Sequence, residues 1–188
     1  MKNDCDIHYF NPTDDSSYIE IGECLINYMR EININDFTPV ILCIGTDRAT
    51  GDCLGPLVGD QLSDFNDSYI VMGKLSSPVH ALNIKDAIRY IRNEIPNPFV
   101  IAVDAALGES SHIGYITVSD CPIYPGKGVQ KKLPAIGDVS ITGIVNVSNN
   151  NPGLLQNTRL YTVMSLANCI SQALKYSINA LESSPYIS

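Results

Sequence analysis

The chain has 188 residues, a formal net charge of −8 and a hydrophobic share of 45%. This length suits one domain with a sizeable core, and the composition is too apolar for a disordered chain. The acidic balance disfavours nucleic acid and anionic membranes as partners, because both require a concentrated positive surface. No window is long and apolar enough for a membrane span. The polar N-terminus lacks the apolar core of a secretory signal, so we expect a cytoplasmic protein.

Cysteine usage gives a second expectation about the compartment. The six cysteines form no CxxC pair, and without a secretory signal they predict reduced thiols rather than disulfides or a zinc ribbon. They are Cys5, Cys24, Cys43, Cys53, Cys121 and Cys169.

The predicted elements begin with a polar stretch over 1–15, which we interpret as a loose leader. Apolar residues at helical spacing then predict an amphipathic helix over 16–32. A continuous apolar run over 40–45 predicts a strand that is buried on both faces. Helical spacing resumes at Leu54, with Pro56 in the first turn of the next predicted helix.

The rest of the chain alternates between strands and helices before two strands follow each other. In order, we predict a strand over 69–72, a helix over 84–95, strands over 99–103 and 114–119, a Pro- and Gly-rich loop over 122–134, a strand over 139–145 and a closing helix over 158–181. Strands that alternate with helices predict parallel pairing with right-handed crossovers. The fold class is therefore α/β, a single three-layer α/β/α sandwich with a mostly parallel central sheet.

The turn after the first predicted strand reads GTDRATG over 45–51 and is followed directly by Asp52. It lacks the Lys-Ser/Thr ending of a P-loop and the GxGxxG spacing of a dinucleotide site. Its two aspartates would also repel phosphate. The turn therefore argues against nucleotide binding.

Two aspartates stand at the ends of predicted parallel strands: Asp52 after the run over 40–45, and Asp104 after the run over 99–103. In α/β sheets the carboxyl ends of such strands open into the crevice where sites are built. Each aspartate alone could be a helix cap or a turn residue. As a pair they would share a proton, with one carboxylate acting as base on a water and the other protonating the carbonyl or leaving group. The same pair could hold a divalent metal, and the sequence does not choose between the two.

Three further polar residues are candidates for substrate binding. Asp47 and Arg48 lie in the turn, and His80 stands just before a predicted helix. Cys53 also offers a thiol nucleophile with His80 as its base. A free cysteine at an apolar helix start is more often a small buried hydrophobe, so the aspartates are the stronger candidates.

The run IGTDRATGDCLGPLVGDQL, with IAVDAALG, PGKGVQKKLPAIGDVSITGIVN and LQNTRLYTVMSLA, resembles the bacterial sporulation protein YyaC family over 40–173. That family looks like a relative of the spore germination protease and, more distantly, of the hydrogenase maturation endopeptidases. The resemblance implies an α/β/α sandwich of the phosphorylase/hydrolase-like type. It also implies a location in the forespore or spore interior.

The resemblance further implies roles for two residues. The essential carboxylates of the germination protease lie in a T-x-D-x-L-G-P loop and after a strand that reads I-D-A, and the matching positions here are Asp52 and Asp104. They imply an aspartate-dependent peptidase whose partners are protein or peptide substrates, such as small acid-soluble spore proteins. Hydrogenase maturation proteases use a later histidine to recognise nickel, and no histidine follows His112 here. We therefore expect no nickel-type site, and the leading hypothesis is a peptidase with no metal and no cofactor. A non-catalytic binding or regulatory protein, and a metal-dependent hydrolase with the same carboxylates, stay open as alternatives.

Overall fold

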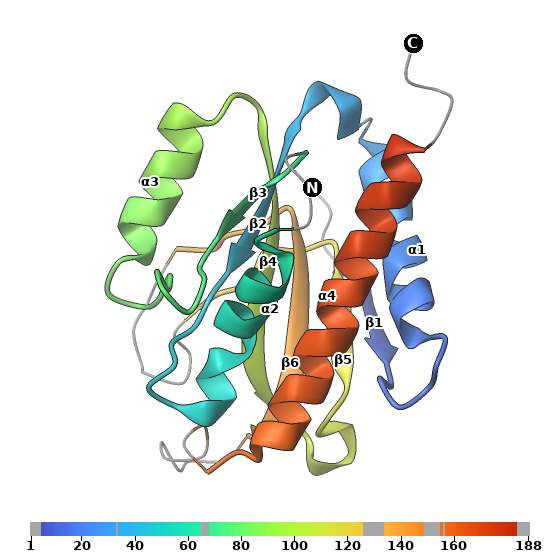
Figure 1. Ribbon diagram of the computed structural model, residues 1–188, viewed down its shortest axis with the longest axis vertical. Helices are drawn as coiled ribbons and strands as arrows, with labels where there is room; N and C mark the ends of the chain where they lie inside the picture. Colours follow the sequence, from blue (N-terminus) through green and yellow to red (C-terminus); the bar gives the residue numbers. More distant parts are fainter. Residues whose placement is uncertain are drawn as a thin grey trace.

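The computed structural model describes residues 5–32, 34–64, 68–125, 134–148, 155 and 157–183. Within these residues, six strands form one sheet, with helices on both of its faces (Figure 1). The strands are β1 (Ile7–Phe10), β2 (Thr38–Cys43), β3 (Ile70–Met72), β4 (Pro98–Gly108), β5 (Ile116–Ser119) and β6 (Val139–Val147). The helices are α1 (Ser17–Glu31), α2 (Leu54–Leu62), α3 (Ile84–Glu94) and α4 (Leu160–Glu182), with short 3₁₀ helices η1 (Ile34–Asp36), η2 (Thr50–Cys53) and η3 (Ser110–His112).

The sheet has the strand order β1-β5-β6-β4-β2-β3. β3, β2, β4 and β6 are parallel, and β5 and β1 are antiparallel to their neighbours. This mostly parallel sheet confirms the predicted α/β class. From β2 the chain moves outward to β3 and then returns to β4 on the other side of β2. The crevice between the carboxyl ends of β2 and β4 is therefore the topological switch point, where open α/β sheets build their sites.

Two hydrophobic cores separate the layers. The larger core lies between the sheet and α1, α2 and α4, with Leu54 and Leu166 fully buried in it. The smaller core lies under α3 and contains Ile84, Ile88 and Ile91. Alternate residues of β2 and β4 enter the two cores, which explains why both strands read as continuous apolar runs. None of the described helices is long and apolar enough to cross a membrane.

The N-terminal segment differs from the sequence prediction. A loose leader is predicted over 1–15, but β1 lies within it and pairs antiparallel with β5. The register pairs Ile7 with Ser119, and its continuation by two residues sets Cys5 opposite Cys121. The structure joins these two cysteines in a disulfide. The prediction of six reduced thiols is therefore wrong for this pair, because it did not anticipate the strand that brings them together. The free cysteines among the described residues are Cys24, Cys43, Cys53 and Cys169.

β4 is longer than its apolar run predicts. The sequence predicts a strand over 99–103, but pairing with β6 continues as far as Gly108. β2 ends earlier, at Cys43, whose partner in β4 is Val103. Figure 1 shows β4 passing the tip of β2. Residues 104–108 of β4 therefore have a described strand on one side only. The loop predicted over 122–134 lies largely outside the described residues.

Candidate active site

The segment after β2 is joined to three others by consecutive backbone N–H groups. The acceptors are the carbonyl groups of Val103, Val79 and Asp52. In the sequence Asp104 directly follows Val103, and His80 directly follows Val79. The switch point therefore gathers three of the residues that the sequence singles out. The hydrogen bonds run from Ile44 to the Val103 carbonyl at 2.7 Å, from Gly45 to the Val79 carbonyl at 2.8 Å and from Thr46 to the Asp52 carbonyl at 3.0 Å.

Two glycines let the turn and α2 approach the end of β2 closely. Gly45 has a φ of 144°, and a Cβ at this position would lie 1.9 Å from the Asp52 carbonyl oxygen. A Cβ on Gly55, in the first turn of α2, would lie 2.2 Å from the Ile44 carbonyl oxygen. No side chain fits at either position, so glycine is required where the backbone segments meet. This packing holds η2, which carries Asp52, beside the strand end.

Asp104 lies on β4 just beyond the last residue that pairs with β2. Its Oδ1 accepts the backbone N–H of Ala105 at 2.8 Å. Burial raises the pKa of Asp104 to about 8, and the negative charge of Asp52 adds to the rise, while the hydrogen bond from Ala105 opposes it. The carboxyl group of Asp104 is therefore mostly protonated at neutral pH. The effect of Asp52 on this pKa places the two predicted acids within electrostatic reach of each other.

Asp52 lies in η2, at the entrance to α2, and is partly buried. Burial raises its pKa as well, but a backbone hydrogen bond from Thr46 and the charge of His80 oppose that rise. Asp52 is therefore the member of the pair that ionises more easily. The two environments raise the two pKa values to different extents, and such a difference is the pattern of an acid and a base.

His80 is held at the start of α3 by local hydrogen bonds. Its backbone N–H donates to Oδ1 of Asn83 at 2.8 Å, and its Nδ1 accepts the N–H of Leu82 at 3.3 Å. The side chain is partly buried and lies close enough to Asp52 to affect its pKa.

Asp47 and Arg48 lie on the exposed outer side of the same turn. The hydroxyl of Thr46 bonds Oδ1 of Asp47 at 3.4 Å, and the backbone N–H of Arg48 donates to the same hydroxyl at 3.4 Å. Both Asp47 and Arg48 are exposed. Their part in substrate binding stays a prediction.

Cys53 does not fit the alternative of a thiol nucleophile. It is 8% exposed, belongs to the larger core, and its Sγ donates to the Thr50 carbonyl at 2.9 Å. Burial raises the pKa of the Cys53 thiol, and the charges of Asp52 and Asp47 add to the rise. A thiol that stays protonated is a poor nucleophile, so the structure favours the ordinary core role.

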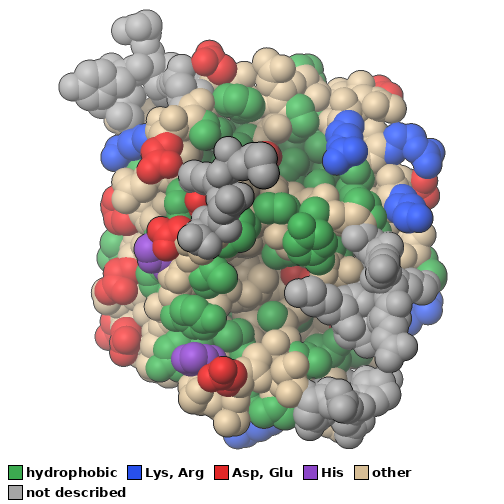
Figure 2. Space-filling view, turned by 180° about the vertical axis from the view of Figure 1, so that it is seen from behind, with side chains coloured by type: hydrophobic (Ala, Val, Ile, Leu, Met, Phe, Trp, Pro, Cys, Tyr) green, Lys and Arg blue, Asp and Glu red, His purple; other side chains and the backbone are tan. Residues whose placement is uncertain are grey.

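Two threonines beside Asp104 were missed by the sequence analysis. The register pairs Asp104 with Thr142 of β6, and Thr142 with Thr117 of β5. Register partners point to the same face of a sheet, and the two threonine hydroxyls lie 2.6 Å apart. They form a polar row on the face opposite the larger core. Figure 2 views the molecule from behind and shows hydrophobic side chains reaching the surface there. The sequence predicted the strand over 139–145, but not the alignment of Thr142 with Asp104.

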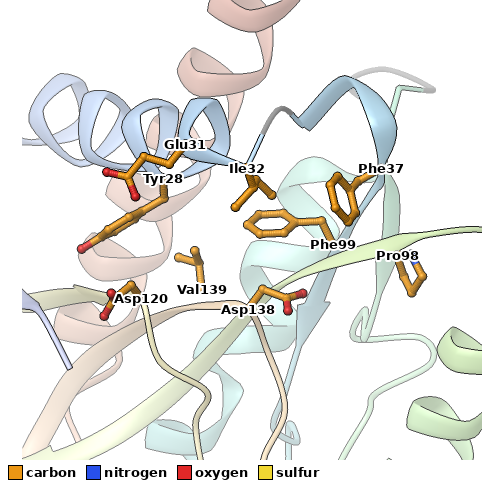
Figure 3. Close-up of a pocket in the computed structure, with 9 residues that line it drawn as sticks. All are labelled: Tyr28, Glu31, Ile32, Phe37, Pro98, Phe99, Asp120, Asp138 and Val139. Atoms are coloured by element: carbon orange, nitrogen blue, oxygen red, sulfur yellow. The ribbon is translucent and has the colours of Figure 1, made fainter. Parts of the chain in front are cut away.

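A second concavity lies at the other end of the parallel strands (Figure 3). Phe99 lines it and stands five residues before Asp104 on β4, so roughly 16 Å of strand separates the two sites. The cavity has a volume of about 250 Å³ and is lined by Tyr28, Glu31, Ile32, Phe37, Pro98, Phe99, Asp120, Asp138 and Val139.

Among the described residues, no group of three or more His, Cys, Asp and Glu side chains could hold a metal ion.

Comparison with known proteins places the chain in a family. A family model described as "Protein of unknown function (DUF1256)" matches residues 9–173. The chain belongs to this family. The uncharacterized protein YyaC of Bacillus subtilis (strain 168) is 46% identical over 168 residues, which cover 88% of this chain and 81% of that protein. The resemblance to the YyaC family is therefore confirmed.

A solved structure shares the fold. The NiFe hydrogenase maturation protease HycI from Thermococcus kodakarensis KOD1 superposes with a TM-score of 0.50 at 18% identity, covering 81% of this chain and 99% of that chain. At this identity the likeness establishes the α/β fold alone.

Proposed function

We propose that this protein is an aspartate-dependent peptidase in which Asp52 and Asp104 share one proton. The observation that carries the proposal is the convergence of the two acids at the end of β2, where the N–H groups of Ile44 and Thr46 bond the carbonyl groups of Val103 and Asp52. Burial and the charge of Asp52 raise the pKa of Asp104 to about 8, which supports it. A carboxyl group that stays protonated at neutral pH, beside a second one that ionises more easily, supplies a general acid and a general base at one place. Peptide hydrolysis needs both.

The proposed reaction uses each aspartate twice. Asp52, as the carboxylate, takes a proton from a water whose oxygen attacks the peptide carbonyl carbon. The carbonyl oxygen takes the proton of Asp104 as its π electrons move to it, which gives a neutral tetrahedral diol. Asp52 then gives its new proton to the amide nitrogen as the C–N bond breaks, and Asp104 recovers a proton from a diol hydroxyl. The products are an acid and an amine, and both aspartates return to their starting states.

The residues around the pair support this division of roles. The charge of His80 and the backbone N–H of Thr46 favour the ionised form of Asp52. Thr142, the register partner of Asp104, places a hydroxyl on the same face of the sheet. Arg48, exposed in the turn after β2, is suited to orient a peptide carboxylate or carbonyl group. We propose that the substrates are proteins of the spore, with small acid-soluble spore proteins the first to test.

The test compares cleavage by the full-length protein and by single variants. We incubate each protein with small acid-soluble spore proteins and with unfolded casein, and identify the products by mass spectrometry. Asp52→Asn and Asp104→Asn are expected to lower the rate by roughly 10³-fold, with an unchanged circular dichroism spectrum. Asp64→Asn, which changes an exposed aspartate after α2, is the matched control and keeps the rate. Full activity of both crevice variants would refute the pair.

The same assay separates the two alternatives. Activity that disappears with a chelator and returns with a divalent cation would favour the metal-dependent hydrolase. Stable complex formation without cleavage of any substrate by the wild-type protein would favour the binding protein. The proposal predicts cleavage that a chelator does not change.

A further inference from the structure

The second half of β4 presents backbone groups to the crevice. Parallel pairing alternates the direction of the groups along a strand. The Val100 carbonyl accepts the N–H of Asp138, on the β6 side, and the Val103 carbonyl accepts the N–H of Ile44, on the β2 side. By this alternation Ala105 directs its N–H and C=O groups toward the side of β2. The register with β6 shifts between Ala106 and Leu107, but the Gly108 carbonyl again faces β6, so Leu107 also directs its groups toward the side of β2. β2 has already ended at that point.

These groups form what we call the open edge of β4, residues 105–107. The Ala105 N–H is held by Oδ1 of Asp104. Among the described residues, no backbone hydrogen bond reaches the Ala105 carbonyl or either backbone group of Leu107 from the β2 side. On the other side, pairing with β6 continues through Gly108, whose carbonyl accepts the N–H of Ser148 at 2.7 Å. Within the described part of the chain, residues 105–107 are therefore paired on the β6 side and have no backbone partner on the β2 side.

We propose that the open edge binds the substrate, and that it takes an extended polypeptide segment as an added strand. This inference rests on the proposed peptidase function and names how that site recognises its substrate. An added strand would run beside β4 at the usual spacing of about 4.8 Å. It would continue the sheet where β2 leaves it, next to the segment that follows β2. A peptide bond in that strand passes directly beside Asp104.

This mode of binding selects a class of substrate. Strand addition uses the backbone N–H and C=O groups of the ligand, so these must be unpaired before binding. Folded helices and paired strands do not meet that condition, but unfolded or loosely structured chains do. The side chains of Ala105 and Ala106 are small and partly exposed, so they restrict the side chains of the substrate only weakly. The site therefore recognises conformation more than sequence.

The first experiment uses Asp104→Asn, which keeps the Ala105 hydrogen bond and is expected to bind without cleaving. A phage library that displays random linear peptides is selected on this variant, and one enriched peptide is synthesised. Single N-methyl groups are then placed on each of its backbone amides in turn. We expect methylation to weaken binding about tenfold at alternate amides only, because alternate N–H groups of a strand face the same neighbour. Equal effects at consecutive amides, or no enriched peptide, would overturn the inference.

The second experiment changes the protein. Leu107→Pro in the same background removes the N–H that faces the crevice and leaves the groups that face β6 in place, as proline on an edge strand can. Leu107→Ala removes the side chain and keeps that N–H. We expect the proline variant to bind the peptide about tenfold more weakly than the alanine variant. Equal affinities, with both variants folded by circular dichroism, would overturn the inference.

The outcomes distinguish this inference from the proposed function. Strand-like binding with no cleavage of the selected peptide by the wild-type protein would leave the open edge established and refute the peptidase. Cleavage that is unchanged when Leu107→Pro is introduced into the wild-type protein, and unchanged by alternate N-methylation of the peptide, would leave the peptidase and refute strand addition.

Discussion

Replacing Asp104 by asparagine is expected to change how the stability of the protein depends on pH. An acid whose pKa is higher in the folded than in the unfolded chain contributes stability that is complete below the unfolded pKa and is lost as pH rises through the folded pKa. For Asp104 these values are 3.8 and about 8. The wild-type protein should therefore lose stability continuously between about pH 4 and pH 8 through this group.

The size of the effect follows from the shift. Each pKa unit corresponds to about 1.4 kcal/mol, and roughly three units separate the unfolded pKa from neutral pH. Because Asp104 keeps some contact with solvent, we expect a loss on the order of 2 to 4 kcal/mol between about pH 4 and pH 7. Asparagine resembles the protonated acid and carries no such penalty. The variant should be less dependent on pH and more stable than the wild type above about pH 8.

The assay is urea unfolding at a series of pH values for the wild type, Asp104→Asn and Asp64→Asn. The last variant removes an exposed carboxylate and should follow the wild-type slope. Parallel curves for the wild type and Asp104→Asn would refute the argument that burial and Asp52 raise the pKa of Asp104.

Three other changes test parts of the account. Gly45→Ala sets a Cβ against the Asp52 carbonyl, so thermal unfolding should show a loss of about 2 kcal/mol or more together with reduced cleavage; an unchanged Tm would contradict the close packing. Cys5→Ser removes the disulfide to Cys121, which closes a long loop, and should lower the unfolding free energy by about 2 to 4 kcal/mol; wild-type stability would show that the bond does not form in solution. Cys53→Ala should keep the rate of cleavage, because the thiol is buried in the core, and a complete loss in a folded variant would reinstate the thiol mechanism.

Elements with strong apolar patterns could be predicted from the sequence. Burial of β2 and β4 shows directly in the sequence as continuous apolar runs, and burial of one face of α3 and α4 shows as helical spacing of apolar residues. The observed bounds of α3 and α4 agree with the predicted ones within a few residues. β1 could not be predicted in this way. Its residues are mostly exposed, so they carry no alternation, and pairing with β5 and a disulfide to Cys121 hold it in place. Both interactions join residues more than a hundred positions apart.

The two acids of the candidate site could be predicted from the sequence, but the contacts that surround them could not. The turn after one apolar run pointed to Asp52, and the aspartate directly after a second apolar run pointed to Asp104. The structure sets the two within electrostatic reach. The contact between Gly45 and Asp52, and the alignment of Thr142 with Asp104, depend on backbone packing and strand register. The length of β4 was underestimated because its second half contains alanine, aspartate and glycine, which have low β-propensity. Pairing with β6 overrides that preference.

The most direct test of the central claim is the titration of the two aspartate carboxyl groups by carbon NMR. The account predicts that the carboxyl carbon of Asp104 keeps the chemical shift of a protonated acid at neutral pH. It also predicts that Asp52→Asn lowers the pKa of Asp104, since the charge of Asp52 contributes to the rise. Two carboxyl groups that both ionise near pH 4, with Asp104 unaffected by the substitution, would show that no proton is shared and would contradict the account.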